Sequence, residues 1–213
     1  MRDGVAGMDP EALEATAVMG RYCDGEAAAF HRLYGMLAPR VLAYLTGLLG
    51  DKAAAEDVLQ LAFLKVHEAR GAYVRGANPI PWIYTIAHRT CLDEMRKRKR
   101  SRVRLTRDGE LGAAPAAHIT GVAEEAHHAE GERSESAAAA MAALEHLPEN
   151  QREALLLTKV HGRSVAEAAM ITGTTPGAIK LRAHRAYVTL RQMLAGTGKP
   201  DQAAQAPSKR ELA

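Results

Sequence analysis

NPIPWIYTIAHRTCLDEMRKRKRSRVRLTR, residues 78–107, holds the only tryptophan of the chain and ends in a dense run of lysine and arginine. Pro81 has a fixed φ and no amide hydrogen to donate, so it suits the first turn of a helix that begins near Ile80. Six residues then recur at helical spacing and predict one buried apolar stripe: Ile83, Ile86, Ala87, Thr90, Cys91 and Met95. The opposite face of this helix is expected to carry Tyr84, His88, Arg89, Leu92 and Arg96.

The basic run from Arg96 to Arg107 contains no acidic residue. Taken alone, such a run has two interpretations that stay open. It is either a surface that binds phosphates and releases their counterions, or it is a charged helix end in solvent or a localisation-type basic patch. The aromatic and polar face that leads directly into the run favours nucleic acid as its partner.

The composition bounds the fold class. A chain of 213 residues can form one large or two small domains. Aromatic residues make up only 4% of the chain and alanine is abundant. Because β-branched and aromatic runs are scarce, the composition favours helices over a sheet. The sequence therefore predicts an all-α protein.

The charge pattern and the two cysteines bear on partners and compartment. The net charge is only +3, but basic regions at 96–107 and 159–191 flank an acidic connector. Cys23 and Cys91 lack metal-ligand spacing and are interpreted as reduced thiols of a cytosolic protein, Cys91 in the core. No apolar run approaches the roughly 18 residues of a membrane span, and no signal-peptide core begins the chain. We expect a cytoplasmic protein without membrane insertion, metal or cofactor.

The periodic segments predict two helical units. Helices are expected over 10–22, from about residue 26 to 48, and over 53–67, which complete a four-helix unit spanning residues 1–100. Residues 101–136 lack sustained periodicity and predict a flexible linker. The linker residues His118, His127 and His128 have no ordered ligand spacing, so solvated histidines are preferred over a metal site. A second unit is expected over 137–195, followed by a disordered tail over 196–213.

The second unit carries the pattern of a helix-turn-helix. Ser164 and Glu167 have capping-box spacing, and Thr175 precedes Pro176 as a cap precedes a first-turn proline. Two short helices joined by a turn with glycine, the second of them basic, are typical of this motif. Four residues of the second helix lie away from its apolar side and could reach phosphates or base edges: Lys180, Arg182, His184 and Arg185. An ordinary amphipathic helix pair is the alternative.

Three segments resemble a known family. They are AEDVLQLAFLKVH (55–67), PWIYTIAHRTCLDEMRKRKR (81–100) and LPENQREALLLTKVHGRSVAEAAMITGTTPGAIKLRAHRAYVTLRQML (147–194). In this order they resemble the bacterial RNA polymerase sigma factors of the extracytoplasmic-function (ECF) group, the two-domain members of the sigma-70 family. The resemblance implies an initiation factor without catalysis of its own, which binds core RNA polymerase and directs it to promoters with −35 and −10 elements.

The resemblance also implies roles for individual residues. Asp57 and Gln60 would contact the clamp helices of the polymerase β′ subunit, and the second unit would meet the β flap. The implied contacts with the −10 region are Trp82, Tyr84, His88, Arg89, Arg96, Arg98 and Arg100. The implied contacts with the −35 region are Thr175, Lys180, Arg182, His184 and Arg185. Since a lone tryptophan beside an apolar stripe usually packs, we expect Trp82 to lie half in the core.

The chain departs from the pattern of this family at several positions. Leu61 stands where glutamate is common, Pro79 where an aromatic is frequent, Arg89 where asparagine is frequent, and Leu181 where serine or arginine is frequent. The promoter sequence can therefore not be carried over from the family. Members of this group are typically held inactive by an anti-sigma factor, and a partner of that kind is expected here.

Two other functions compete with this one. A conventional helix-turn-helix regulator that acts without polymerase would explain the second unit but leaves 79–107 without a role. An enzyme is disfavoured because the sequence offers no Ser/His/Asp set, phosphate loop or metal-ligand spacing.

Overall fold

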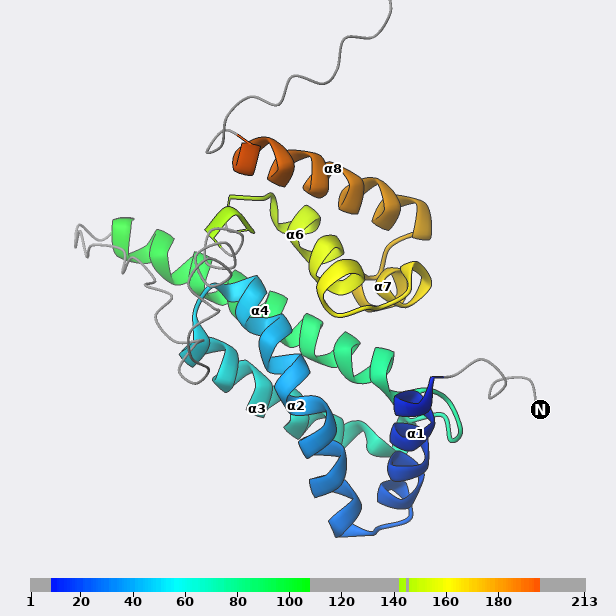
Figure 1. Cartoon of the computed structure of the whole chain (residues 1–213). Coiled ribbons are helices and arrows are strands. Elements are labelled where there is room, and N and C mark those ends of the chain that lie inside the picture. Colours follow the sequence, from blue (N-terminus) through cyan, green and yellow to red (C-terminus); the bar gives the residue numbers. More distant parts are fainter. Residues whose placement is uncertain (1–8, 108–141, 145, 196–213) are drawn as a thin grey trace, which may run out of the picture.

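The computed structural model describes residues 9–107, 142–144 and 146–195, and within these residues it contains helices and no strand. The N-terminal unit consists of α1 (Pro10–Cys23), α2 (Ala27–Leu49), α3 (Lys52–Ala69) and α4 (Pro79–Arg107), with a 3-10 turn at Arg70–Ala72. The C-terminal unit consists of α6 (Glu149–Leu155), a π-helical turn (Leu156–Val160), α7 (Val165–Thr172) and α8 (Pro176–Ala195). The long helix α4 contacts α1, α2 and α3 of its own unit and α7 of the other (Figure 1). The predicted all-α fold with two helical units is confirmed.

Aspartate side chains cap the starts of α1 and α3, and a glycine ends α2. The Asp9 carboxylate accepts a hydrogen bond from the Ala12 amide at 2.7 Å, and Asp51 accepts one from the Ala54 amide at 3.3 Å. Each bond satisfies one of the amides that a helix start leaves without a partner. Gly50 ends α2 with a φ of 67°, which a residue with a β-carbon adopts only with strain.

Helix α4 begins as the prolines predict but continues further than expected. The Asn78 side chain accepts a hydrogen bond from the Ile80 amide at 3.0 Å. The predicted apolar stripe packs inward, since Ile83, Ala87 and Cys91 are fully buried. The helix then runs on to Arg107, past the boundary placed at residue 100, so the first part of the predicted linker is helical. Lysine and arginine are good helix formers, and the basic run carries the helix on. The other linker residues, with His118, His127 and His128, and the tail over 196–213 lie outside the described residues.

The caps of the C-terminal unit follow the sequence closely. The Ser164 hydroxyl accepts a hydrogen bond from the Glu167 amide at 3.1 Å, and the Glu167 carboxylate accepts one from the Ser164 amide at 2.8 Å. This reciprocal pair is the predicted capping box of α7. Gly173 ends α7 in the left-handed conformation, and the Thr175 hydroxyl accepts from the Ala178 amide at 3.2 Å at the start of α8. The left-handed Gly173 and the Thr175 side chain therefore fix the two ends of the turn between α7 and α8.

Removal of the capping box at the start of α7 tests how much it stabilises this helix. We expect Ser164→Ala to lower the free energy of unfolding of the C-terminal unit by about 1 kcal/mol, because the Glu167 amide loses its acceptor. Urea unfolding followed by circular dichroism measures the change, and Ser164→Thr, which keeps the hydroxyl, is the control. Equal stability of the alanine and threonine variants would show that the cap does not stabilise α7.

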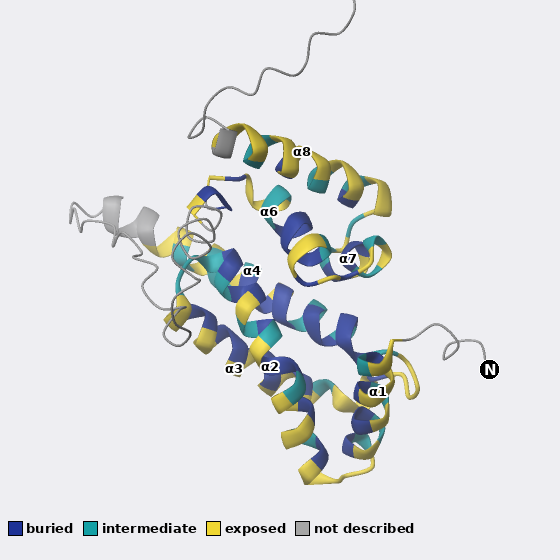
Figure 2. Cartoon of the chain, in the orientation of Figure 1, coloured by how far each residue is buried: buried dark blue, intermediate teal, exposed yellow. Residues whose placement is uncertain are grey.

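The two units pack against each other in one continuous core (Figure 2). Gly47 of α2 lies so close to Leu156 that a β-carbon built on it would stand 3.0 Å from the nearest leucine methyl group. One residue further along α2, the Leu48 carbonyl accepts a hydrogen bond from Arg152 Nη1 at 3.1 Å. Since a larger residue at position 47 would displace Leu156, this glycine permits the close approach. We call this packing of the two units the closed arrangement.

Among the described helices, none combines the length and the apolar composition that crossing a membrane requires.

Candidate nucleic-acid and polymerase interfaces

The second helix of the helix-turn-helix, α8, presents part of its predicted DNA-contacting set to solvent. Lys180, His184 and Arg185 are exposed on α8, and Thr175 is exposed at its start. The Thr175 hydroxyl oxygen is already an acceptor in the cap. Lys180 and Arg185 therefore provide accessible positive charge on the helix that the motif places in a major groove.

Arg182 lies differently from its neighbours. Its side chain is half-buried at the side of α8 that faces α6, where it influences Glu153. Burial and the nearby Glu149 raise the pKa of Glu153 to about 7, and the positive charges of Arg182 and Arg152 oppose that shift. The prediction that Arg182 lies on the same outward face as Lys180 is therefore wrong for this structure, because the position of Arg182 on α8 turns it toward Glu153.

Trp82 and Arg89 lie where their sequence pattern places them. The Trp82 ring is half-buried and stands 5.5 Å from the Tyr73 ring, measured between centroids. The expectation that Trp82 lies half in the core is confirmed. Arg89 is exposed about two turns before the basic run of α4.

The expected outward orientation of Tyr84 and His88 is wrong for the closed arrangement. Only 1% of Tyr84 and 2% of His88 is exposed. The C-terminal unit covers both: the Arg163 guanidinium lies over the Tyr84 ring at 5.8 Å, and His88 Nε2 stands 3.9 Å from Glu153 Oε1. A helix face that looks polar in the sequence is here the contact surface between the two units.

The polar contacts under the C-terminal unit form between largely neutral groups. The Tyr44 hydroxyl and His88 Nδ1 share a hydrogen bond of 2.9 Å. Burial, with a smaller contribution from Arg89, lowers the pKa of His88 to about 4, so the ring is neutral at pH 7. The contact between His88 and Glu153 is therefore not an ion pair at neutral pH. The hydrogen bond between Tyr44 and His88, rather than an ion pair between His88 and Glu153, therefore contributes to this part of the closed arrangement.

Acidic side chains of the same unit pair with several residues of the basic run. Arg96 lies 3.1 Å from Asp93, and Lys97 lies 3.8 Å from Glu94. Arg98 contacts Glu94 at 3.2 Å and Asp51 at 3.4 Å. These pairs are partly solvated and contribute little to stability, as expected for local pairing of Asp93 and Glu94. Arg100 is exposed further along the same helix.

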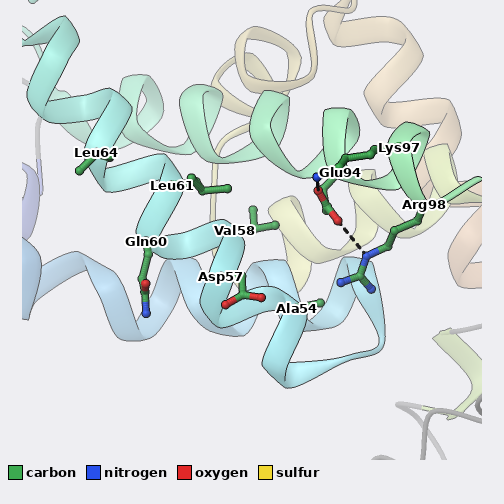
Figure 3. A pocket seen from close by; sticks show the side chains of 9 residues that line it. All are labelled: Ala54, Asp57, Val58, Gln60, Leu61, Leu64, Glu94, Lys97 and Arg98. Atoms are coloured by element: carbon green, nitrogen blue, oxygen red, sulfur yellow. Dashed lines mark hydrogen bonds and ion pairs between the residues drawn. The ribbon is translucent and has the colours of Figure 1, made fainter. Parts of the chain in front are cut away.

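The surface between α3 and α4 forms a groove (Figure 3). Asp57 and Gln60 line it from α3, where both are exposed, and Lys97 and Arg98 line it from α4. Leu61 and Leu64 belong to the same surface, and 49% of Leu61 and 60% of Leu64 is exposed. The sequence analysis noted Leu61 only as a departure from the family pattern, so it missed this apolar pair. The signal available was their spacing of three residues, which puts them on one face.

Models of two protein families match this chain. A family model described as Sigma-70 region 2 matches residues 33–101, and one described as Sigma-70, region 4 matches residues 137–190. The chain is 36% identical over 176 residues to the RNA polymerase sigma factor CarQ of Myxococcus xanthus, covering 83% of this chain and 95% of CarQ. It is 32% identical to the ECF RNA polymerase sigma factor BldN of Streptomyces coelicolor, covering 87% of this chain and 68% of BldN.

A solved structure shares the fold. The sigma factor RpoE, in a co-crystal with the anti-sigma factor NepR from Bartonella quintana, superimposes with a TM-score of 0.63 at 27% identity. The match covers 78% of this chain and 96% of that chain. The two matched regions fall on the two helical units described above, in the same order. The chain belongs to the ECF RNA polymerase sigma factors of the sigma-70 family.

Proposed function

We propose that this protein is a transcription initiation factor that binds core RNA polymerase and directs it to promoters with −35 and −10 elements. The observation that carries this function is the presence, on one chain, of an exposed basic recognition helix in the region 4 unit and a long basic helix in the region 2 unit. Such a protein needs no catalytic group of its own. Its polymerase and promoter partners are in the cytoplasm.

The proposed contacts divide between the two units. Lys180, His184 and Arg185 of α8 bind the −35 element, with Thr175 at the helix start. Trp82, Arg89, Arg96, Arg98 and Arg100 of α4 bind the −10 region, and Tyr84 and His88 join them only when the C-terminal unit leaves α4. Asp57 and Gln60 bind the clamp helices of the polymerase β′ subunit, and the C-terminal unit binds the β flap. The conventional regulator that acts without polymerase is not favoured, because it leaves the region 2 unit without a role.

Run-off transcription on a library of genomic fragments tests the proposal. We expect purified core polymerase to give transcripts with shared upstream elements only when this protein is added. Lys180→Ala/Arg185→Ala should lose most of these transcripts, because two cations on the exposed face of α8 are removed. Arg32→Ala/Lys159→Ala removes the same charge outside α4 and α8 and should leave them unchanged.

The outcome that contradicts this function is equally direct. The absence of both transcripts and co-migration with core polymerase would reject the initiation-factor function. Stable homodimers on palindromic DNA without polymerase would then support the regulator instead.

An anti-sigma factor is a further proposed partner. The related RpoE was solved with the anti-sigma factor NepR. We propose that a partner of this class binds this protein. Affinity capture of the full chain from its own cell extract, with reversal by added core polymerase, is the corresponding measurement.

A further inference from the structure

The buried residues of α8 show which direction is outward, because the outward face lies opposite to them. Ile179 and Ala186 are fully buried, and Ala183 and Leu190 pack partly against the same core. At about 100° per residue, Leu181 points about 170° away from the mean direction of these four residues. Leu181, and not one of the basic residues, therefore stands at the centre of the outward face.

The surroundings of Leu181 are cationic. Lys180 precedes it, and His184 and Arg185 stand one turn further along on either side of the same outward direction. About half of Leu181, 49%, is exposed, and no helix in the described part of the chain covers it. A single exposed leucine is common on protein surfaces. This leucine is informative because it occupies the central position of a basic recognition helix.

The chemistry of the major groove offers one group that an apolar side chain at this position can contact. The N-terminal part of a recognition helix contacts base edges, and Leu181 lies in the second turn of α8. Among the base edges of the major groove, only thymine presents a methyl group, and apolar side chains contact it. The neighbouring cations suit the phosphates on both sides of the groove.

We propose that Leu181 contacts the C5-methyl group of a thymine in the −35 element and thereby sets a preference for thymine at that position. This inference rests on the proposed function, because it requires α8 to lie in the major groove of the −35 element. It adds Leu181 as a specificity-determining residue, whose apolar contact the basic residues of α8 cannot make.

Replacement of thymine by uracil tests the contact, because uracil lacks only the methyl group. The probe is a promoter fragment recovered by the run-off selection, prepared with deoxyuridine at each thymine of the −35 region in turn. For the complex of this protein with core polymerase, we expect one or two replacements to weaken binding about fourfold, the effect of one buried carbon group. For Leu181→Ala, the same replacements should change binding by less than 1.5-fold.

The control is Tyr187→Ala, which removes an exposed apolar side chain from another side of α8. It should keep the full sensitivity to uracil of the unchanged protein. The inference is overturned if the unchanged protein is insensitive to every replacement, or if Leu181→Ala retains the fourfold difference. In one form of the first result, the unchanged protein binds thymine and uracil fragments equally tightly, and Leu181→Ala binds both equally weakly. That result also overturns the inference, because it would indicate that Leu181 makes an apolar contact with a protein partner. Each of these results leaves the initiation function itself intact, since all of them use a fragment already selected by transcription.

Discussion

Leu61→Glu/Leu64→Glu is expected to weaken binding of core RNA polymerase about 100-fold. Both leucines are exposed on the surface that carries Asp57 and Gln60. Full burial of a leucine contributes about 1.5 to 3 kcal/mol, and 49% of Leu61 and 60% of Leu64 is still exposed in the free protein. Burying the remainder of both therefore contributes about 1.6 to 3.3 kcal/mol, or about 15- to 250-fold in the dissociation constant. The introduced carboxylates would lose hydration in the same interface, which adds to the loss. Titration of labelled core polymerase with each protein measures the dissociation constant.

The control for this pair is Leu13→Glu/Val74→Glu. It introduces the same two charges at exposed apolar positions of the same unit, away from the groove. This double variant should bind polymerase as tightly as the unchanged protein, and both variants should unfold at the same denaturant concentration. Equal affinity of the two variants would exclude the α3 surface as the polymerase contact.

Gly47→Leu is expected to shift the closed arrangement toward separated units. A leucine side chain has no room beside Leu156, where even a β-carbon would be in close contact. Overpacking of this kind costs about 1 to 3 kcal/mol, which lowers the ratio of closed to separated molecules by about 5- to 150-fold. Small-angle X-ray scattering should report a larger radius of gyration for the variant.

Chemical modification of histidine provides a second measurement of the same shift. His88 and His161 are both buried beneath the contact between the units, whereas His31 is exposed. Diethylpyrocarbonate should modify His31 equally in all variants but His88 and His161 faster in Gly47→Leu. Gly35→Leu is the matched control, since it adds the same side chain to the same helix where nothing lies within 4 Å. Unchanged protection of His88 in Gly47→Leu would show that Leu156 adjusts without separation of the units.

Local chemistry made most helices predictable. The cap residues Ser164 and Thr175 occur in short patterns whose physical effect extends over only three residues, so no tertiary information is needed to recognise them. The apolar stripe of α4 was readable for the same reason, since Ile83, Ala87 and Cys91 follow the helical period.

Contacts between the units were not predictable in this way. Tyr84 and His88 carry polar atoms, and on a single helix they fit the solvent face. They are buried because α2 and the C-terminal unit supply Tyr44, Arg163 and Glu153 as neighbours, from positions 40 or more residues distant. Arg182 was misplaced for a related reason: its direction depends on where α8 packs against α6, which residue type alone does not reveal.

The apolar pair on α3 illustrates a different limit. Leu61 and Leu64 are ordinary core residues by type, so a periodic pattern assigns a leucine to the core by default. Only the packed structure shows that α3 presents its other side, with Val58 and Ala62, to the core. An exposed pair of this kind can be identified only once the structure shows which apolar side chains stay outside the core.

Because Tyr84 and His88 are buried between the units, the affinity of any ligand for this face of α4 depends on how readily the units separate. A ligand that contacts either side chain binds only molecules whose units have parted, so its apparent dissociation constant equals the intrinsic constant divided by the open fraction. With an open fraction of roughly one in a hundred, the apparent affinity is about a hundredfold weaker, although no contact of the ligand has changed. A protein that holds the units together and one that holds them apart therefore regulate the same contacts in opposite directions, and neither needs to touch that ligand.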